Sequence, residues 1–112
     1  MLRRRKRPDA LQGSLDLLVL KILSRGPQHG YGVARHIETA SGDLLRVEEG
    51  SLYPALHRMQ QLGWIAAEWQ TTENNRRARV YRLTRAGETR LDEERVRWER
   101  LTRGVDKVLR FA

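Results

Sequence analysis

Apolar positions follow a helical period through the first half of this chain. The first stripe predicts a helix that stops at Gly26-Pro27, because proline cannot continue the hydrogen-bond ladder. Its members, spaced i, i+3, i+4, i+7 and i+8, are Leu15, Leu18, Val19, Ile22 and Leu23. After a short loop at 28–30, Val33, Ala34 and Ile37 predict a second helix ending near Ser41-Gly42.

A third helix is predicted in the stretch GSLYPALHRMQQLGW, residues 50–64. Leu52, Leu56 and Met59 would share one buried stripe, and the helix would end at Gly63. The opposite face carries Pro54, His57, Arg58 and Gln61 in place of the usual solubilising Glu and Lys. We expect Pro54 to be tolerated because first-turn N–H groups lack intrahelical acceptors.

The period then changes from helical to alternating. Residues 64–69 and 79–84 read as two strands around a polar turn at 71–76, and helix returns from Arg85 onward. The order helix, helix, helix, hairpin predicts an α+β, mainly α, winged helix-turn-helix fold: three helices plus a β-hairpin wing, then a C-terminal dimerisation helix. We divide the chain into a basic flexible arm (1–10), a winged-helix DNA-binding domain (11–86) and the dimerisation helix (87–112).

Charge narrows the choice of partner. The 112 residues carry a net charge of +8 and a sequence pI near 11.0, which favours an anionic partner. The run Arg3-Arg4-Arg5-Lys6-Arg7 supplies five of these charges, either as a solvated tail or as an arm that touches phosphate. Cysteine is absent and no apolar run approaches 18 residues. We expect a cytoplasmic protein with no membrane contact, nucleoid-associated when bound to DNA.

The polar face of the third helix has the chemistry to read bases. Arginine can bind guanine bidentately and glutamine can pair with adenine, while Ser51, Tyr53 and His57 can reach phosphates or base edges. A proline offers an apolar surface to a thymine methyl group. The alternative is a face that is merely solvated.

The presumed wing is rich in arginine, with Glu73 the only acid between Thr71 and Arg85. Arginines at a projecting hairpin suit a ladder of phosphates. Charge that protects an edge strand from aggregation is the alternative, although glutamate would serve that purpose equally. The arginines are Arg76, Arg77, Arg79, Arg82 and Arg85.

Five strings in register make a resemblance specific. GSLDLLVLKIL (13–23), HGYG (29–32), GSLYPALHRM (50–59), LGWI (62–65) and VYRLTRAGETRL (80–91) resemble the PadR-like transcriptional regulators in order and spacing. The resemblance covers nearly the whole chain after the basic run, which is not part of the shared pattern. It implies a homodimeric winged-helix repressor that releases DNA when a small molecule binds or conditions change.

Carried over by position, the resemblance implies which residues touch DNA. The reading helix would contribute Ser51, Tyr53, Pro54, His57 and Arg58, and the wing Arg76, Arg77 and Arg79. Tyr31, from the HGYG string, would more readily pack the second helix against its neighbours, although in such proteins that region can also approach DNA. Ser51 stands where threonine is common and keeps the hydroxyl, and Met59 replaces a frequent leucine in the core.

The last helix carries a seven-residue apolar repeat typical of a dimer interface. Its members are Leu91, Trp98, Leu101, Val105 and Val108, with Glu94 interrupting the seam. Two copies would place the reading helices roughly 34 Å apart on a pseudo-palindromic operator. The resemblance adds that Trp98 could line a cavity between subunits for a flat apolar effector; an interface tryptophan that only packs is the alternative.

No feature indicates an enzyme, a metal site or a cofactor. The three histidines lack HExxH-like spacing, and the chain has neither a phosphate-cradling glycine loop nor a cysteine nucleophile. A non-specific nucleic-acid-coating protein and a winged-helix protein-interaction module are the competing hypotheses. For a regulator, Arg58→Ala should relax sequence preference, whereas Arg77→Ala should weaken binding to all sequences alike.

Overall fold

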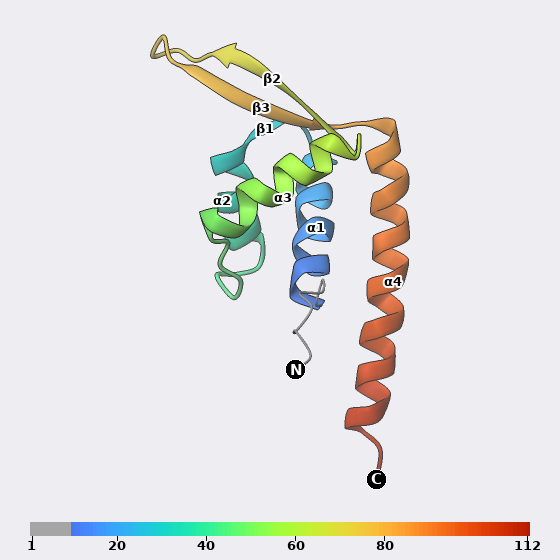
Figure 1. Ribbon diagram of the computed structural model, residues 1–112. Helices are drawn as coiled ribbons and strands as arrows, with labels where there is room; N and C mark the ends of the chain where they lie inside the picture. Colours follow the sequence, from blue (N-terminus) through green and yellow to red (C-terminus); the bar gives the residue numbers. More distant parts are fainter. Residues whose placement is uncertain (1–9) are drawn as a thin grey trace, which may run out of the picture.

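The computed structural model describes residues 10–112, with side chains from Ser14 on, so the basic run 3–7 lies outside the described residues. Four helices and three short strands follow one another along the chain (Figure 1). They are α1 (Ala10–Leu23), β1 (Gln28–His29), α2 (Gly30–Ala40), α3 (Glu49–Gln61), β2 (Ile65–Thr71), β3 (Arg77–Leu83) and α4 (Arg85–Leu109). The predicted mainly helical winged-helix fold is confirmed. No helix within residues 10–112 is long and apolar enough to cross a membrane.

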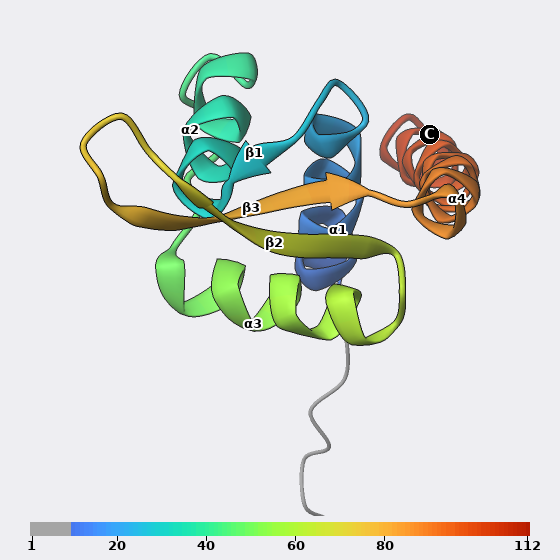
Figure 2. The same cartoon turned by 90° about the horizontal axis from the view of Figure 1, so that it is seen from above.

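The sheet is antiparallel, in the order β1-β3-β2 (Figure 2). The hairpin of β2 and β3 pairs from Ile65↔Leu83 to Thr71↔Arg77, and its tip reaches past the helices. Asn75 closes the turn with a φ of 61°, a left-handed conformation that asparagine adopts more readily than most residues. The loop predicted at 28–30 is wrong for Gln28 and His29, which form β1. Two residues are too few to show a period, and only their pairing with Tyr81 and Val80 makes them a strand.

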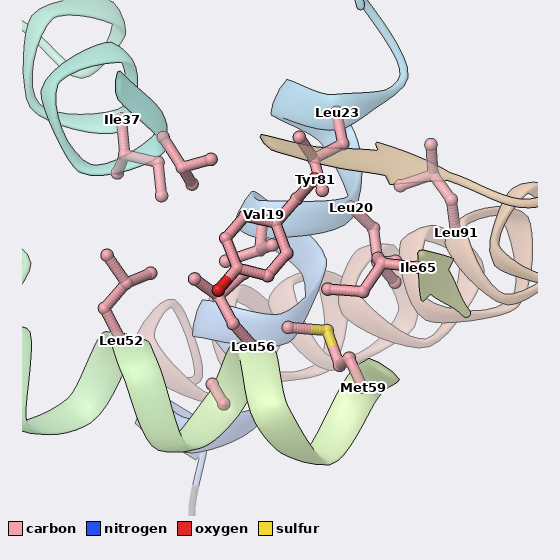
Figure 3. Packing of buried hydrophobic residues seen from close by; sticks show 12 residues of the cluster. Val19, Leu20, Leu23, Ile37, Leu52, Leu56, Met59, Ile65, Tyr81 and Leu91 are labelled. Atoms are coloured by element: carbon pink, nitrogen blue, oxygen red, sulfur yellow. The ribbon is translucent and has the colours of Figure 1, made fainter. Parts of the chain in front are cut away.

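The core lies beneath the sheet, where α1, α2 and α3 meet (Figure 3). The predicted stripe of α3 is confirmed, because Leu52 is 1% exposed and Leu56 and Met59 are fully buried. They pack with the apolar face of α1 and with residues of the sheet. The remaining core members include Val19, Leu20, Leu23, Val33, Ile37, Ile65, Tyr81 and Leu91.

Helix α4 is fastened to the end of α3 by its own first turn. Thr84 caps α4, accepting a hydrogen bond from the Gly87 N–H at 3.0 Å, and its hydroxyl lies 2.6 Å from the Gly63 carbonyl. The backbone N–H of Thr84 also donates to the Trp64 carbonyl at 3.1 Å. These contacts tie α4 to the turn between α3 and β2.

Gly87 makes this close approach possible. A Cβ atom at position 87 would lie 2.0 Å from the Trp64 carbonyl oxygen, and a backbone atom cannot swing aside. Beyond this joint α4 runs beside α1 and extends past its start (Figure 1). The glycine of the AGETRL segment therefore has a packing role at the joint between α4 and the domain.

We expect Gly87→Ala to lower the free energy of unfolding by about 1–3 kcal/mol, because the added methyl group forces α4 away from β2. Chemical denaturation monitored by circular dichroism measures this. Gly104→Ala is the matched control, since position 104 of the same helix has open space around it. There, alanine should raise stability by about 0.5–1 kcal/mol through its higher helix propensity. Equal effects of the two substitutions would contradict the close-packing argument.

Candidate nucleic-acid interface

The outer face of α3 is open to solvent along its length. Ser51, Pro54, His57 and Gln61 are exposed, and Tyr53 is 42% exposed. Because the leucine-methionine stripe is buried on the other side, the helix cannot rotate to hide these groups. In the view from above, α3 lies along one side of the sheet, beside β2 (Figure 2).

The start of α3 is positioned by the segment before it. The backbone N–H of Val47 donates to the Glu38 carboxylate at 3.1 Å, which joins the connecting loop to α2. Glu49 lies in the first turn of α3, where a negative charge suits the positive end of the helix dipole. These contacts fix where the exposed face begins.

Tyr53 does more than line the outer face. Its ring closes on the backbone of Gly30, where a Cβ atom would lie 2.8 Å from the ring edge. Burial against α2 raises the pKa of the Tyr53 phenol, and the nearby Glu49 carboxylate raises it further. The neighbouring Gly32 likewise leaves room for the Gln28 side chain. The glycines of the HGYG string therefore allow α2 to approach α3 and β1 closely.

Pro54 lies deeper in the helix than expected. Helix α3 begins at Glu49, so Pro54 is its sixth residue and belongs to the second turn. The expectation that its missing N–H falls in the first turn is wrong, because the helix starts earlier than the apolar stripe suggests. The Gly50 carbonyl loses its usual i+4 donor here. Pro54 remains exposed at the centre of the outer face.

Arg58 is engaged inside the domain. Its two terminal nitrogens donate to the Asp16 carboxylate of α1 at 3.0 and 2.7 Å, a bidentate ion pair. The hydrogen bond with Asp16 raises the pKa of Arg58. The guanidinium side chain is 37% exposed, and three of its five N–H donors remain outside this pair. Arg58 thus holds α3 on α1 and keeps a fixed orientation at the edge of the outer face.

The register of the hairpin sorts the wing arginines by face. Paired residues of an antiparallel ladder share a face, so Arg77 and Arg79 lie on the same side as Tyr81, which is buried in the core. Arg82, paired with Ala66, lies on the other side. Arg76 belongs to the turn, where its N–H donates to the Thr72 hydroxyl at 3.2 Å. All four are exposed.

A direct contact joins the wing to α3. The Arg79 guanidinium lies 3.5 Å from the Gln60 side-chain oxygen, near the end of the helix. A hollow of about 360 Å³ opens between the wing and the starts of α2 and α3. Tyr31 borders this hollow and is 63% exposed, with its hydroxyl accepting from Arg35 at 2.8 Å. The expectation that Tyr31 mainly packs is therefore wrong, because α2 turns it outward.

The sequence reasoning missed one aromatic residue of the wing. Trp69 on β2 is 53% exposed and stands opposite Arg79 in the ladder. In the sequence, Trp69 is one position of the alternating pattern that predicts the strand. Its position, two residues before the polar turn and beside a cluster of arginines, is the signal that could have singled it out.

The apolar repeat of α4 divides into two parts. Leu91 is 8% exposed and belongs to the core of its own domain, so its assignment to a seam or effector pocket is corrected. Glu94, which interrupts the repeat, is buried and pairs with Arg90. Beyond Glu94 the side chains of the repeat are exposed to solvent in the single chain. Their exposed fractions are 42% for Trp98, 46% for Leu101, 48% for Val105 and 73% for Val108.

Comparison with known proteins decides the family. The sequence profile described as "Transcriptional regulator PadR-like family" matches residues 19–93, from α1 into α4. The chain belongs to the PadR-like family of transcriptional regulators. A relative, Transcriptional regulator Rv3488 of Mycobacterium tuberculosis, is 45% identical over 60 residues, which is 54% of this chain and 55% of that protein.

Solved structures agree with this assignment. A transcriptional regulator from Clostridium thermocellum superposes with a TM-score of 0.81 at 26% identity, covering 88% of this chain and 96% of that one. A PadR family transcriptional regulator from Eggerthella lenta gives a TM-score of 0.78 at 31% identity, covering 91% and 88%. This PadR-like chain therefore shares the arrangement of its helices and wing with regulators of the same family. Within residues 10–112, no three His, Asp or Glu side chains come close enough together to hold a metal ion.

The ion pair between Arg58 and Asp16 predicts a stability effect. Arg58→Ala and Asp16→Asn should each lower the free energy of unfolding by about 1–2 kcal/mol, a range that allows for partial solvent screening. The double variant should lose less than the sum, because both substitutions remove the same interaction. Gln61→Ala, an exposed change on the same helix, should stay within about 0.5 kcal/mol of the parent. If the losses of the two single variants added up to the loss of the double variant in denaturation experiments, the ion pair would contribute nothing to the free energy of unfolding.

Proposed function

We propose that this PadR-like regulator binds a pseudo-palindromic DNA operator, with α3 in the major groove and the hairpin wing along the backbone. The observation that carries this proposal is the arrangement of the two elements. The outer face of α3 is free of core contacts, and the wing that adjoins it presents arginines on the side nearest α3.

Within this proposal the residues have separate roles. His57 and Gln61 are exposed at the centre and end of the face and would meet base edges, together with Ser51 and Pro54. Tyr53, whose ring leans on Gly30, would reach a phosphate with its hydroxyl. Arg58, oriented by Asp16, would use its remaining donors. Arg76, Arg77 and Arg79 would contact phosphates, which carry affinity and not sequence.

We further propose that the chain acts as a homodimeric repressor. The exposed repeat on α4 supports this, because a lone domain leaves Trp98, Leu101 and Val105 partly in water. A flat apolar molecule binding beside Trp98 at the seam would release the DNA by changing the angle between the two domains. The limits 11–86 for the reading domain and 87–112 for the dimerisation helix belong to the same proposal, with Leu91 anchoring the helix to the core.

Selection of bound sites from random duplexes tests the DNA proposal. The selected site should show two half-sites about one helical turn apart and bind at least ~10³-fold more tightly than random DNA. Arg77→Ala should weaken binding to both kinds of DNA and make the salt dependence shallower by about one unit. Gln61→Ala should weaken only the selected site. Arg82→Ala, on the other face of the same strand, is the control and should change little.

Other outcomes point to the competing functions. Equal affinity for all sequences would indicate a non-specific nucleic-acid-coating protein. Unchanged DNA binding after charge reversal at Arg58 and Arg77 would favour a protein-interaction module. If Gln61→Ala and Arg77→Ala had the same effect, the division between a reading helix and a phosphate-binding wing would be wrong.

The dimer proposal predicts that Val105→Asp converts a dimer to a monomer, because it places a charge in an apolar seam. Sedimentation velocity at micromolar concentration measures this. Val96→Asp is the control, since Val96 is 56% exposed but lies on the opposite side of α4. A planar dye should quench tryptophan emission in the parent and not in Val105→Asp or Trp98→Phe. A Val105→Asp protein that remained dimeric would overturn the assignment of the seam.

A further inference from the structure

Trp69 occupies an unusual place for a large aromatic residue. It lies on β2 near the far end of the hairpin, outside the core, and is 53% exposed. Its ladder partner is Arg79, and the next pair on the same face joins Thr71 to Arg77. The indole therefore shares a face with both arginines that the wing turns toward α3.

Both arginines contact the indole. The Arg77 guanidinium carbon is 4.7 Å from the ring centroid of Trp69, and that of Arg79 is 5.4 Å away. Both distances are within the range of about 6 Å in which a cation is attracted to the negative face of an aromatic ring. The neutral indole of Trp69 thus attracts both guanidinium groups, whose positive charges repel each other on this face of the hairpin.

The wing uses no carboxylate for this purpose. Among the residues that the structure describes, five of the six ion pairs lie along α4 or at its end, and the sixth joins Arg58 to Asp16. Glu68, next to Trp69, lies on the opposite face of the strand because it pairs with Val80. The charges of Arg77 and Arg79 are therefore left for a partner outside the chain.

The kind of contact matters for binding phosphate. A carboxylate would take up the guanidinium N–H donors and cancel the charge, as Asp16 does for two donors of Arg58. A ring contact restrains a guanidinium through its face and leaves the N–H donors in its plane available. Arg79 gives only a 3.5 Å contact to Gln60, which sets its place relative to α3.

We propose that Trp69 is a positioning residue for DNA binding. Its indole holds Arg77 and Arg79 in extended positions beside α3, with their donors directed to two phosphates of the DNA backbone. Ordering the two long side chains beforehand reduces the conformational entropy lost on binding. This role rests on the proposed DNA-binding function, and it assigns the affinity of the wing to three residues acting together.

Two substitutions separate ring contact from simple packing. Trp69→Leu keeps an apolar side chain on the strand but removes the aromatic face, whereas Trp69→Phe keeps a smaller face. We expect Trp69→Leu to weaken binding to selected and random duplexes alike by about 3- to 10-fold, and Trp69→Phe to stay within about 2-fold of the parent. Thermal unfolding confirms that each variant is folded. Equal losses for leucine and phenylalanine would overturn the proposal.

A double-mutant cycle tests whether Trp69 acts through the arginines. In a chain carrying Arg77→Ala and Arg79→Ala, Trp69→Leu should have almost no further effect on DNA affinity. The salt dependence of Trp69→Leu should also be shallower than that of the parent, because fewer phosphates are neutralised. If Trp69→Leu cost the same affinity with and without the two arginines, the indole would act independently of them.

A measurement without DNA separates this proposal from the proposed function. In NMR spectra of the free protein, ring currents of Trp69 should shift the side-chain resonances of Arg77 and Arg79. Trp69→Leu should abolish these shifts, while Trp69→Phe should keep part of them. Unshifted arginine resonances in the parent would overturn the positioning role. A parent that shows the shifts but binds neither selected nor random duplexes would refute the DNA-binding function alone.

Discussion

The packing of one stripe of α3 against α1 and the sheet is the contact on which the rest of the structure depends. Leu52, Leu56 and Met59 are almost fully buried, and each contributes about 1.5–3 kcal/mol through burial. This packing fixes the rotation of α3 about its own axis. The polar side chains of the other face therefore stay in water, where they are available to a partner. The bidentate contact of Arg58 with Asp16 secures the same helix from its flank.

The arginines of the domain differ in the side chains that they contact. Carboxylates one turn away pair with Arg90, Arg95 and Arg97 of α4 and with Arg110 at its end. Arg58 is paired across two helices. The arginines of the wing face that adjoins α3 meet an indole instead, which orders them and leaves their charge in place. Cations at an exposed edge are what the proposed contact with DNA phosphates requires of this surface.

The first turns of helix α4 pack on the domain, whereas its later turns extend beyond the core. Its first turns are held by the cap at Thr84, by the close packing of Gly87 and by Arg90, whose guanidinium carbon lies 4.6 Å from the ring centroid of Trp64. Its later turns carry exposed apolar residues beyond the core. Because Trp64 leads directly into the wing, this joint connects the start of α4 to the proposed DNA surface, while Leu91 joins the same helix to the core.

The sequence by itself determined the four helices, the hairpin and the family, because helical and alternating periods are local and the shared strings lie in register along the chain. It also determined that Pro54, His57 and Gln61 of α3 face outward. Only the tertiary structure decided the partners: Asp16 is 42 residues from Arg58 in sequence, and Trp69 meets Arg77 only through the register of the hairpin. The same holds for Leu91, whose heptad position suits a seam but whose place beside the core buries it within its own domain. Periodicity gives the direction of a side chain about its own element, whereas its contacts depend on how the elements pack.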